Sequence, residues 1–170
     1  MYNFNSYYEF IASTVNQQIG QGECWDYVNL IWDHLGSRYY TYPPSDPSST
    51  NHGVKWGWIN TEARAANTIS GLTQIPSLSD VKRGDIVIIS DGEYGHAGFA
   101  DEDYDGTGYL YMYDQNYNNV RYVMRHHISM STFLGAWRYD AWHDQPVPIT
   151  RSKFKWVLYA NKLRGKPNMI

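Results

Sequence analysis

The chain has 170 residues, enough for one domain with a sizeable hydrophobic core. Its formal net charge is -3 and only 18% of its residues are charged, which argues against the basic surface that nucleic-acid binding needs. We therefore expect one globular domain that is a monomer and has no nucleic-acid partner.

The N-terminal segment MYNFNSYYEF lacks the basic start and the apolar run of a signal peptide, and no stretch is long enough for a membrane helix. We therefore expect no membrane insertion. Aromatic and aliphatic side chains at helical spacing predict a first helix over residues 4–17. Gly20 and Gly22 then interrupt the helical pattern.

Cys24 is the only cysteine, so an internal disulfide and a four-cysteine metal site are both excluded. Apolar residues follow it at spacings of three, four and four: Tyr27, Ile31 and Leu35. This pattern predicts a helix that begins at Cys24 and is closed by Gly36. The free amide groups and the dipole of a helix N-terminus stabilise a thiolate over a thiol. Cys24 is therefore either a nucleophile or a small buried core residue.

The second half of the chain changes from helical to strand patterns. Residues 39–53 contain three prolines and no periodicity, which predicts a loop that can rim a cleft, and a short helix is expected from about Trp56 to Ala66. Five strands are then predicted, at 85–90, 95–101, 108–116, 120–129 and 133–140. Helices followed by antiparallel strands predict an α+β architecture with the N-terminal helices packed on the sheet.

Six histidines compete for the role of general base beside Cys24. His34 lies ten residues along the same helix, which is about 15 Å at 1.5 Å per residue and too far. His52 and His143 lie in segments where solvated surface histidines are usual. His126 and His127 are adjacent on a predicted strand, so only one of them can face the core, and that one remains a rival.

His96 is the favoured base because its neighbours are small. Gly95, Ala97 and Gly98 would let a bound peptide approach the imidazole closely. His126 or His127 stays open as the alternative at this stage.

Four segments occur in a characteristic order: GECWDYVN, VKRGDIVII, YGHAGFA and YMYDQN. Over about residues 5–140, this set resembles the CHAP family of cysteine, histidine-dependent amidohydrolases and peptidases. The resemblance implies a papain-like α+β fold and cleavage of peptide or amide bonds in bacterial peptidoglycan, as in phage lysins. It implies Cys24 as the nucleophile and His96 as the general base, with Asp114 and Asn116 matching the glutamate and asparagine of the family's E-Q-N motif. No cofactor is implied.

Two features depart from the family pattern. Glu23 stands where a glutamine is common, and a carboxylate close to the Cys24 sulfur would disfavour the thiolate. The acidic calcium loop that many phage members carry ahead of the cysteine is also absent. DEDYDG at 101–106 begins like a calcium loop, but Met112 stands where an EF-hand has its closing glutamate. We therefore expect no metal site.

The hairpin that joins the strands of His96 and Asp114 provides an internal test. A two-residue turn at Asp105 and Gly106 would place Gln115 opposite His96, which would separate the proposed triad. A three-residue loop over 105–107, or a single bulge, would instead place Asn116 opposite His96 and keep Asp114 on the same face. The triad hypothesis therefore predicts an odd loop or a bulge.

We expect residues 1–143 to form the catalytic domain. Residues 144–170 are expected to be an extension or linker, because the last 20 residues carry six basic side chains and no acidic one. The resemblance predicts a peptidoglycan hydrolase, either an endopeptidase or an amidase, that acts at the bacterial cell wall. Without a signal peptide, such an enzyme would reach the wall through phage lysis, on a virion or by non-classical export. The alternatives are another papain-like cysteine acyltransferase or isopeptidase, and a non-catalytic wall-binding or virion structural domain.

Overall fold

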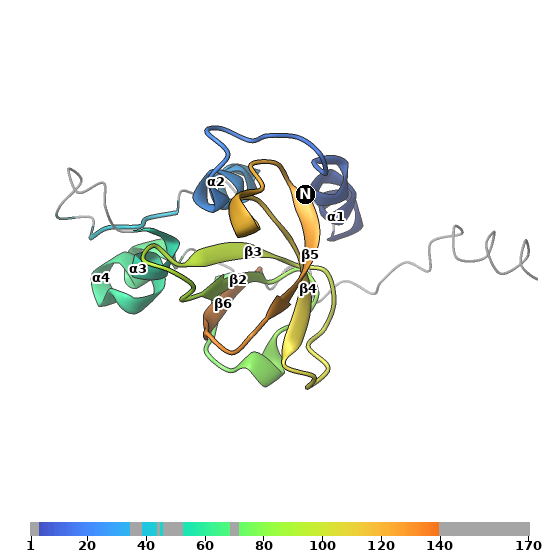
Figure 1. The fold of residues 1–170 in the computed structure, drawn as a ribbon. Helices are drawn as coiled ribbons and strands as arrows, with labels where there is room; N and C mark the ends of the chain where they lie inside the picture. Colours follow the sequence, from blue (N-terminus) through green and yellow to red (C-terminus); the bar gives the residue numbers. More distant parts are fainter. Residues whose placement is uncertain (1–3, 35–38, 44, 46–52, 69–71, 140–170) are drawn as a thin grey trace, which may run out of the picture.

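The computed structural model describes residues 4–34, 39–43, 45, 53–68 and 72–139 (Figure 1). In these residues, four α-helices precede one antiparallel sheet, so the predicted α+β class is confirmed. The helices are α1 (Phe4–Ser13), α2 (Cys24–His34), α3 (Gly53–Ile59) and α4 (Thr61–Asn67). None of the described helices has the length and apolar character needed to cross a membrane. Residues 140–170, with the predicted extension at 144–170, lie outside the described part of the chain.

The sheet has six strands in the order β1-β6-β2-β3-β4-β5. They are β1 (Leu72–Ile75), β2 (Ile86–Ile89), β3 (His96–Ala100), β4 (Tyr109–Asp114), β5 (Met124–Ser129) and β6 (Phe133–Tyr139). Two short 3₁₀ turns, Leu78–Asp80 and Tyr117–Asn119, lie between strands. The sequence predicted five of these strands. It missed β1, which is short and pairs with β6 at the edge of the sheet.

The helices differ from their predicted bounds for local reasons. The first helix ends at Ser13 and cannot extend to the predicted residue 17, because Asn16 adopts a left-handed φ of 67°, which a right-handed helix does not allow. The single helix expected over 56–66 is two helices. The Asn60 side chain accepts a hydrogen bond of 2.9 Å from the amide of Ala63 and so starts α4 as its N-cap.

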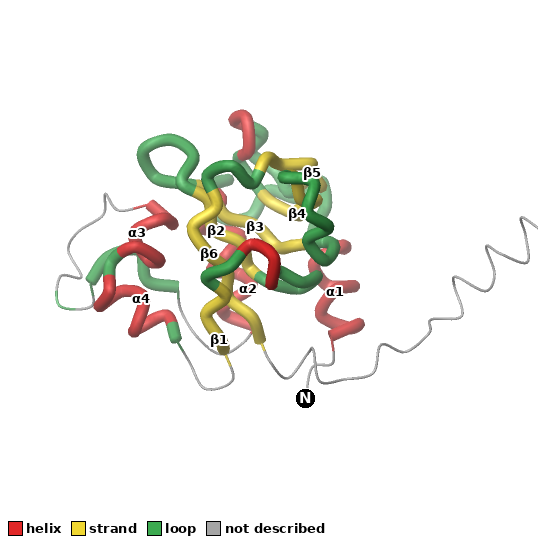
Figure 2. Tube along the Cα trace, turned by 90° about the horizontal axis from the view of Figure 1, so that it is seen from below, coloured by secondary structure: helices red, strands yellow, loops and turns green. Residues whose placement is uncertain are grey.

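Helices cover one face of the sheet. In Figure 1, α2 lies across that face, with α1 at one end and α3 and α4 at the other, and the view from below in Figure 2 shows the same separation. One hydrophobic core joins these helices to the sheet. Its largest members include Tyr7 and Ile11 of α1, Tyr27 and Trp32 of α2, Trp58 of α3, and Phe99 and Trp137 of the sheet.

A second core lies on the opposite face of the sheet. There, side chains of neighbouring strands contact one another and the segment around Val81. The central strand β2 contributes Val87 and Ile89 to this core, and Ile86 and Ile88 to the other. This arrangement explains why residues 86–89 form an uninterrupted apolar run, since both faces of the strand are buried.

Candidate active site

Cys24 occupies the first turn of α2, as the sequence predicts. The carboxylate of Asp26 accepts hydrogen bonds from the amide of Glu23, at 3.0 Å, and from the amide of Gln21, at 2.8 Å. Asp26 is the third residue of the helix, and its side chain accepts from the amide of Glu23, the residue that precedes the helix, as in a capping box. These two hydrogen bonds fix the start of the helix and so hold Cys24 in its first turn.

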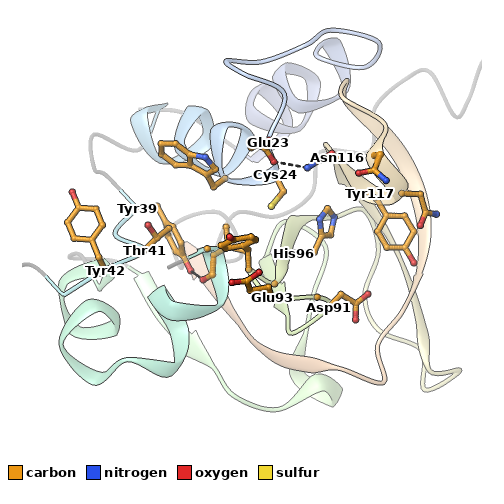
Figure 3. Close-up of a pocket in the computed structure, with 18 residues that line it drawn as sticks. Glu23, Cys24, Tyr39, Thr41, Tyr42, Asp91, Glu93, His96, Asn116 and Tyr117 are labelled. Atoms are coloured by element: carbon orange, nitrogen blue, oxygen red, sulfur yellow. Dashed lines mark hydrogen bonds between the residues drawn. The ribbon is translucent and has the colours of Figure 1, made fainter. Parts of the chain in front are cut away.

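His96 is the first residue of β3 and its side chain is only 8% exposed. Its Nε2 atom lies 3.2 Å from Oδ1 of Asp114, whose side chain is fully buried. The sulfur of Cys24 and the imidazole of His96 face each other across the cleft (Figure 3). The structure therefore brings together Cys24, His96 and Asp114, from α2, β3 and β4.

The electrostatics of His96 follow from this geometry. Burial alone would lower the pKa of the imidazole, but hydrogen bonding to Asp114 and Cys24 and their negative charges outweigh it. The pKa of His96 is raised from 6.5 to about 10. The imidazole is therefore held as a cation at neutral pH, which is the form that stabilises a neighbouring thiolate.

The register of β3 and β4 agrees with the triad hypothesis. Gly98 lies opposite Asp114, which places Asp114 on the same face as His96 and puts Asn116 opposite His96 when the register is extended. The predicted parity is thus confirmed. The connection is an odd loop, as the triad hypothesis predicts, but it is longer than the expected 105–107, because residues 101–111 lie between the last pair of β3 and β4, Ala100 and Met112.

Asn116 does not turn toward His96. Its backbone adopts a left-handed conformation, with φ 72°, and its Nδ2 atom donates a 2.7 Å hydrogen bond to Glu23 (Figure 3). Glu23 also forms an ion pair with Arg121. The carboxylate that precedes Cys24 is therefore paired with a cation and an amide, which offsets its repulsion of a thiolate.

Gln115 is a further residue of the site. From the sequence it was considered only as the residue that a two-residue turn would place opposite His96. Its buried side chain accepts from the amide of Ile19, at 2.8 Å, and donates to the carbonyl groups of Ile19, at 3.0 Å, and Glu23, at 2.8 Å. It ties the loop before Cys24 to the end of β4. The E-Q-N resemblance contained this residue, so the signal was present in the sequence.

The two adjacent histidines of β5 point to opposite faces, as their alternation requires. His126 Nδ1 lies 2.8 Å from Oδ2 of Asp114. His127 is exposed and stacks on Tyr111, with ring centroids 4.3 Å apart. The histidine that faces inward is therefore His126, and it contacts Asp114, whereas His96 is the one that faces Cys24.

The remaining candidates have other surroundings. His34, at the far end of α2, packs edge-on against Phe10 of α1 with ring centroids 4.0 Å apart. His52 and His143 lie outside the described residues. The aspartates of the 101–106 segment are engaged with protein groups: Asp101 pairs with Arg125, Asp103 with Lys82, and Asp105 accepts from Thr107.

Cys24 and His96 open into a cleft of about 820 Å³ (Figure 3). The turn-rich loop predicted to rim a cleft contributes Tyr39, Thr41 and Tyr42 to its lining. The 116–119 turn forms another part of the wall, with Tyr117 beside His96. Trp25 and Tyr94 also line the cleft and remain 41% and 50% exposed, so aromatic surface is available to a bound molecule.

No family model matches the chain, and no curated protein matches it. Several solved structures, however, are similar to it. The chain is similar to the wild-type endolysin LysIME-EF1, with 21% identity and a TM-score of 0.58 over 81% of this chain and 64% of that one. It is also similar to Ly7917, with 21% identity and a TM-score of 0.54 over 82% of this chain and 63% of that one.

A third similar structure is Ly7917 with the hydrolysis product of MDP, at 22% identity and a TM-score of 0.52 over 80% of this chain and 62% of that one. The chain thus spans less than two thirds of the length of each of these solved chains. At this level of identity the similarity concerns the fold. The α+β fold that carries Cys24, His96 and Asp114 is therefore one that this chain shares with an endolysin.

Proposed function

We propose that this protein hydrolyses a peptide or amide bond of bacterial peptidoglycan, with Cys24 as the nucleophile and His96 as its general base. The observation that carries the proposal is the meeting of Cys24, at a helix N-terminus, with an imidazole that contacts the buried carboxylate of Asp114, at an open cleft. The shared fold with the endolysin LysIME-EF1 supports a cell-wall polymer as the substrate. The resemblance to the CHAP family supports the same chemistry.

The site is costly to build, which favours a catalytic role over a purely structural one. Burying a charged pair away from water carries a large desolvation cost, and two well-packed apolar side chains would often be as stable. A histidine whose pKa is raised to about 10 beside the only cysteine is the kind of perturbed group that gathers at functional sites.

In the proposed reaction, the Cys24 thiolate attacks the scissile carbonyl carbon, and the carbonyl oxygen takes the negative charge. The amide of Cys24, in the first turn of α2, helps to hold this oxyanion. His96 then donates its proton to the leaving amine as the carbon–nitrogen bond breaks, which leaves a thioester on Cys24. A water molecule, deprotonated by His96, attacks the thioester and releases the acid product and the thiolate.

The cleft suits a polymer of sugars and peptides. Its aromatic lining, with Trp25, Tyr42 and Tyr94, offers apolar ring faces for stacking and polar groups for hydrogen bonds. Its volume of about 820 Å³ has room for several residues of a peptide.

The test is digestion of purified cell walls by the protein and by Cys24→Ser. New amino termini or reducing ends are identified by mass spectrometry. We expect wild-type protein to release new amino groups, and their identity separates cleavage of the amide between glycan and stem peptide from cleavage within the peptides. Cys24→Ser should release none while its circular dichroism spectrum and melting temperature stay near wild type, because a hydroxyl is far harder to ionise than a thiol. Cleavage by Cys24→Ser, or new reducing ends in place of amino groups, would overturn the proposal.

A further inference from the structure

Asp114 contacts two imidazoles, one through each of its carboxylate oxygens. Oδ1 lies 3.2 Å from Nε2 of His96, and Oδ2 lies 2.8 Å from Nδ1 of His126. The Asp114 side chain is fully buried, and those of His96 and His126 are 8% and 18% exposed. The proposed chemistry uses only the first of these contacts, so the second one requires an explanation.

Strand register makes this arrangement part of the sheet. Asp114 and Met112 are two apart on β4, and His126 lies directly opposite Met112 on β5. Gly98 lies opposite Asp114 on β3, two residues from His96. Since side chains alternate along a strand, His96, Asp114 and His126 all project from the same face of three adjacent strands.

Tyr117 packs against both imidazoles. Its ring centroid lies 5.4 Å from that of His96 and 5.3 Å from that of His126. Within the described part of the chain, the titratable groups that contact the two histidines include Asp114 from β4, Tyr117 from the turn between β4 and β5, and Cys24 from α2. Tyr117 and His96 both line the cleft, whereas Asp114 and His126 lie behind this lining.

We propose that His126 is a positioning residue for this site: its Nδ1–H donates to Oδ2 of Asp114 and fixes the carboxylate with Oδ1 facing His96. The inference rests on the Cys24–His96 pair of the proposed function, but it does not depend on the substrate. His126 itself does not contact the reacting atoms.

The physical need for such a residue comes from the aspartate side chain. The torsion that rotates a carboxylate about its Cβ–Cγ bond is broad and roughly two-fold, so rotamer preference alone does not fix its orientation. An ionised carboxylate only accepts hydrogen bonds, so the 2.8 Å contact requires the proton on Nδ1 of His126. A donor on Oδ2 therefore selects the rotation in which Oδ1 faces Nε2 of His96.

The test measures the rate of Cys24 alkylation by iodoacetamide against pH, which requires no cell-wall substrate. The variants are His126→Leu, which removes the donor, and His126→Asn, whose amide nitrogen can take the place of Nδ1. His127→Leu is the matched control, because His127 is the next residue and lies exposed on the opposite face of the sheet. Circular dichroism and melting temperature verify that each variant is folded.

We expect His126→Leu to move the acid limb of the alkylation profile upward by about half a pH unit or more, which is about a threefold loss of rate at a fixed pH on that limb. The reason is that a mispositioned carboxylate supports the His96 cation less, and this cation stabilises the thiolate. In His126→Asn and His127→Leu, the acid limb of the alkylation profile should stay at the wild-type pH. An unchanged limb in His126→Leu would overturn the proposal, and so would an equal shift in His126→Asn, which would assign the effect to packing.

A second measurement needs no variant. Nitrogen-15 NMR of the wild-type imidazoles should find a proton on Nδ1 of His126, and an Nδ1 without a proton would overturn the proposal. The proposed function is tested separately by wall digestion. If walls stay intact while the alkylation and NMR results are as expected, the substrate is wrong and the role of His126 stands.

Discussion

Gly98 of β3 and Asp114 of β4 lie directly opposite each other, and the aspartate side chain fills the space where a larger residue at 98 would project. A Cβ atom at position 98 would lie 2.8 Å from Cβ of Asp114 and 2.7 Å from Cε of Met112. The small residues around His96 were interpreted from the sequence as access for a substrate. For Gly98, the structure gives another reason, because its missing side chain makes room for Asp114.

Gly98→Ala should therefore displace Asp114 from His96. We expect a loss of activity of about 10- to 100-fold, because small displacements of catalytic groups strongly lower the reaction rate. We also expect a loss of about 1–3 kcal/mol in the free energy of unfolding from overpacking. The measurements are wall-clearing rate and urea denaturation. Gly106→Ala is the control: it sits at an open position with φ 88°, so it should cost stability without affecting the cleft. Full activity in Gly98→Ala would contradict this account.

Asp114→Asn should narrow the pH range of activity on its alkaline side. The variant keeps the shape of the side chain but weakens the hydrogen bonding of Asp114 and removes its charge, which together with Cys24 raise the pKa of His96 to about 10. The imidazolium is then lost at a lower pH, so the alkaline limb of kcat/KM moves down. The measurement is kcat/KM against pH on a soluble peptidoglycan fragment.

Asn116→Ala is the companion variant, and it should lower kcat/KM while leaving the alkaline limb in place. Asn116 bonds to Glu23 and not to the imidazole, so its loss disturbs the segment before Cys24 without changing the charge at His96. An unchanged limb in Asp114→Asn together with a large loss in Asn116→Ala would reverse the assignment and make asparagine the third member of the triad.

Gln115→Ala should reduce both stability and activity. The substitution removes three part-buried hydrogen bonds to Ile19 and Glu23. The amide of Ile19 loses its partner, whereas the two carbonyl groups still accept from the amides of Gly22 and Asp26. At about 1 kcal/mol per bond, with an added penalty for the unpaired amide of Ile19, we expect a loss of about 2–4 kcal/mol in the free energy of unfolding. Urea denaturation measures it. Gln74→Ala, which removes one exposed hydrogen bond to Thr68, is the matched control and should change stability little.

Activity should not depend on calcium. Asp101 is committed to Arg125 and to the Tyr8 hydroxyl, and Asp105 accepts two hydrogen bonds from Thr107, so binding a cation would require breaking these contacts. Wall clearing is compared before and after treatment with EDTA, and again after calcium is restored. A loss that calcium reverses and magnesium does not would show that these carboxylates form a metal site.

The sequence alone was sufficient for the local features of the site. The apolar spacing after Cys24 and the glycines before it predicted a helix with the cysteine in its first turn, because helix periodicity and breakers are local properties. Alternation along the strands likewise required that only one of His126 and His127 face inward. The α+β class followed from the order of these local patterns.

Tertiary structure decided which side chains meet. The pairing of β4 with β5 brings His126 to Asp114, and no periodicity in the sequence specifies that register. The same holds for β1, a short edge strand whose place depends on pairing with the distant β6.

The difference between Asp114 and Asn116 shows the physical reason most clearly. Both lie on the face of His96 by strand parity, so the sequence left either one as its partner. The left-handed turn at Asn116 carries that side chain to Glu23, while Asp114 stays in the strand and contacts the imidazole. Local pattern fixes the face on which a side chain lies, but its partner depends on backbone turns and on groups brought from elsewhere in the chain.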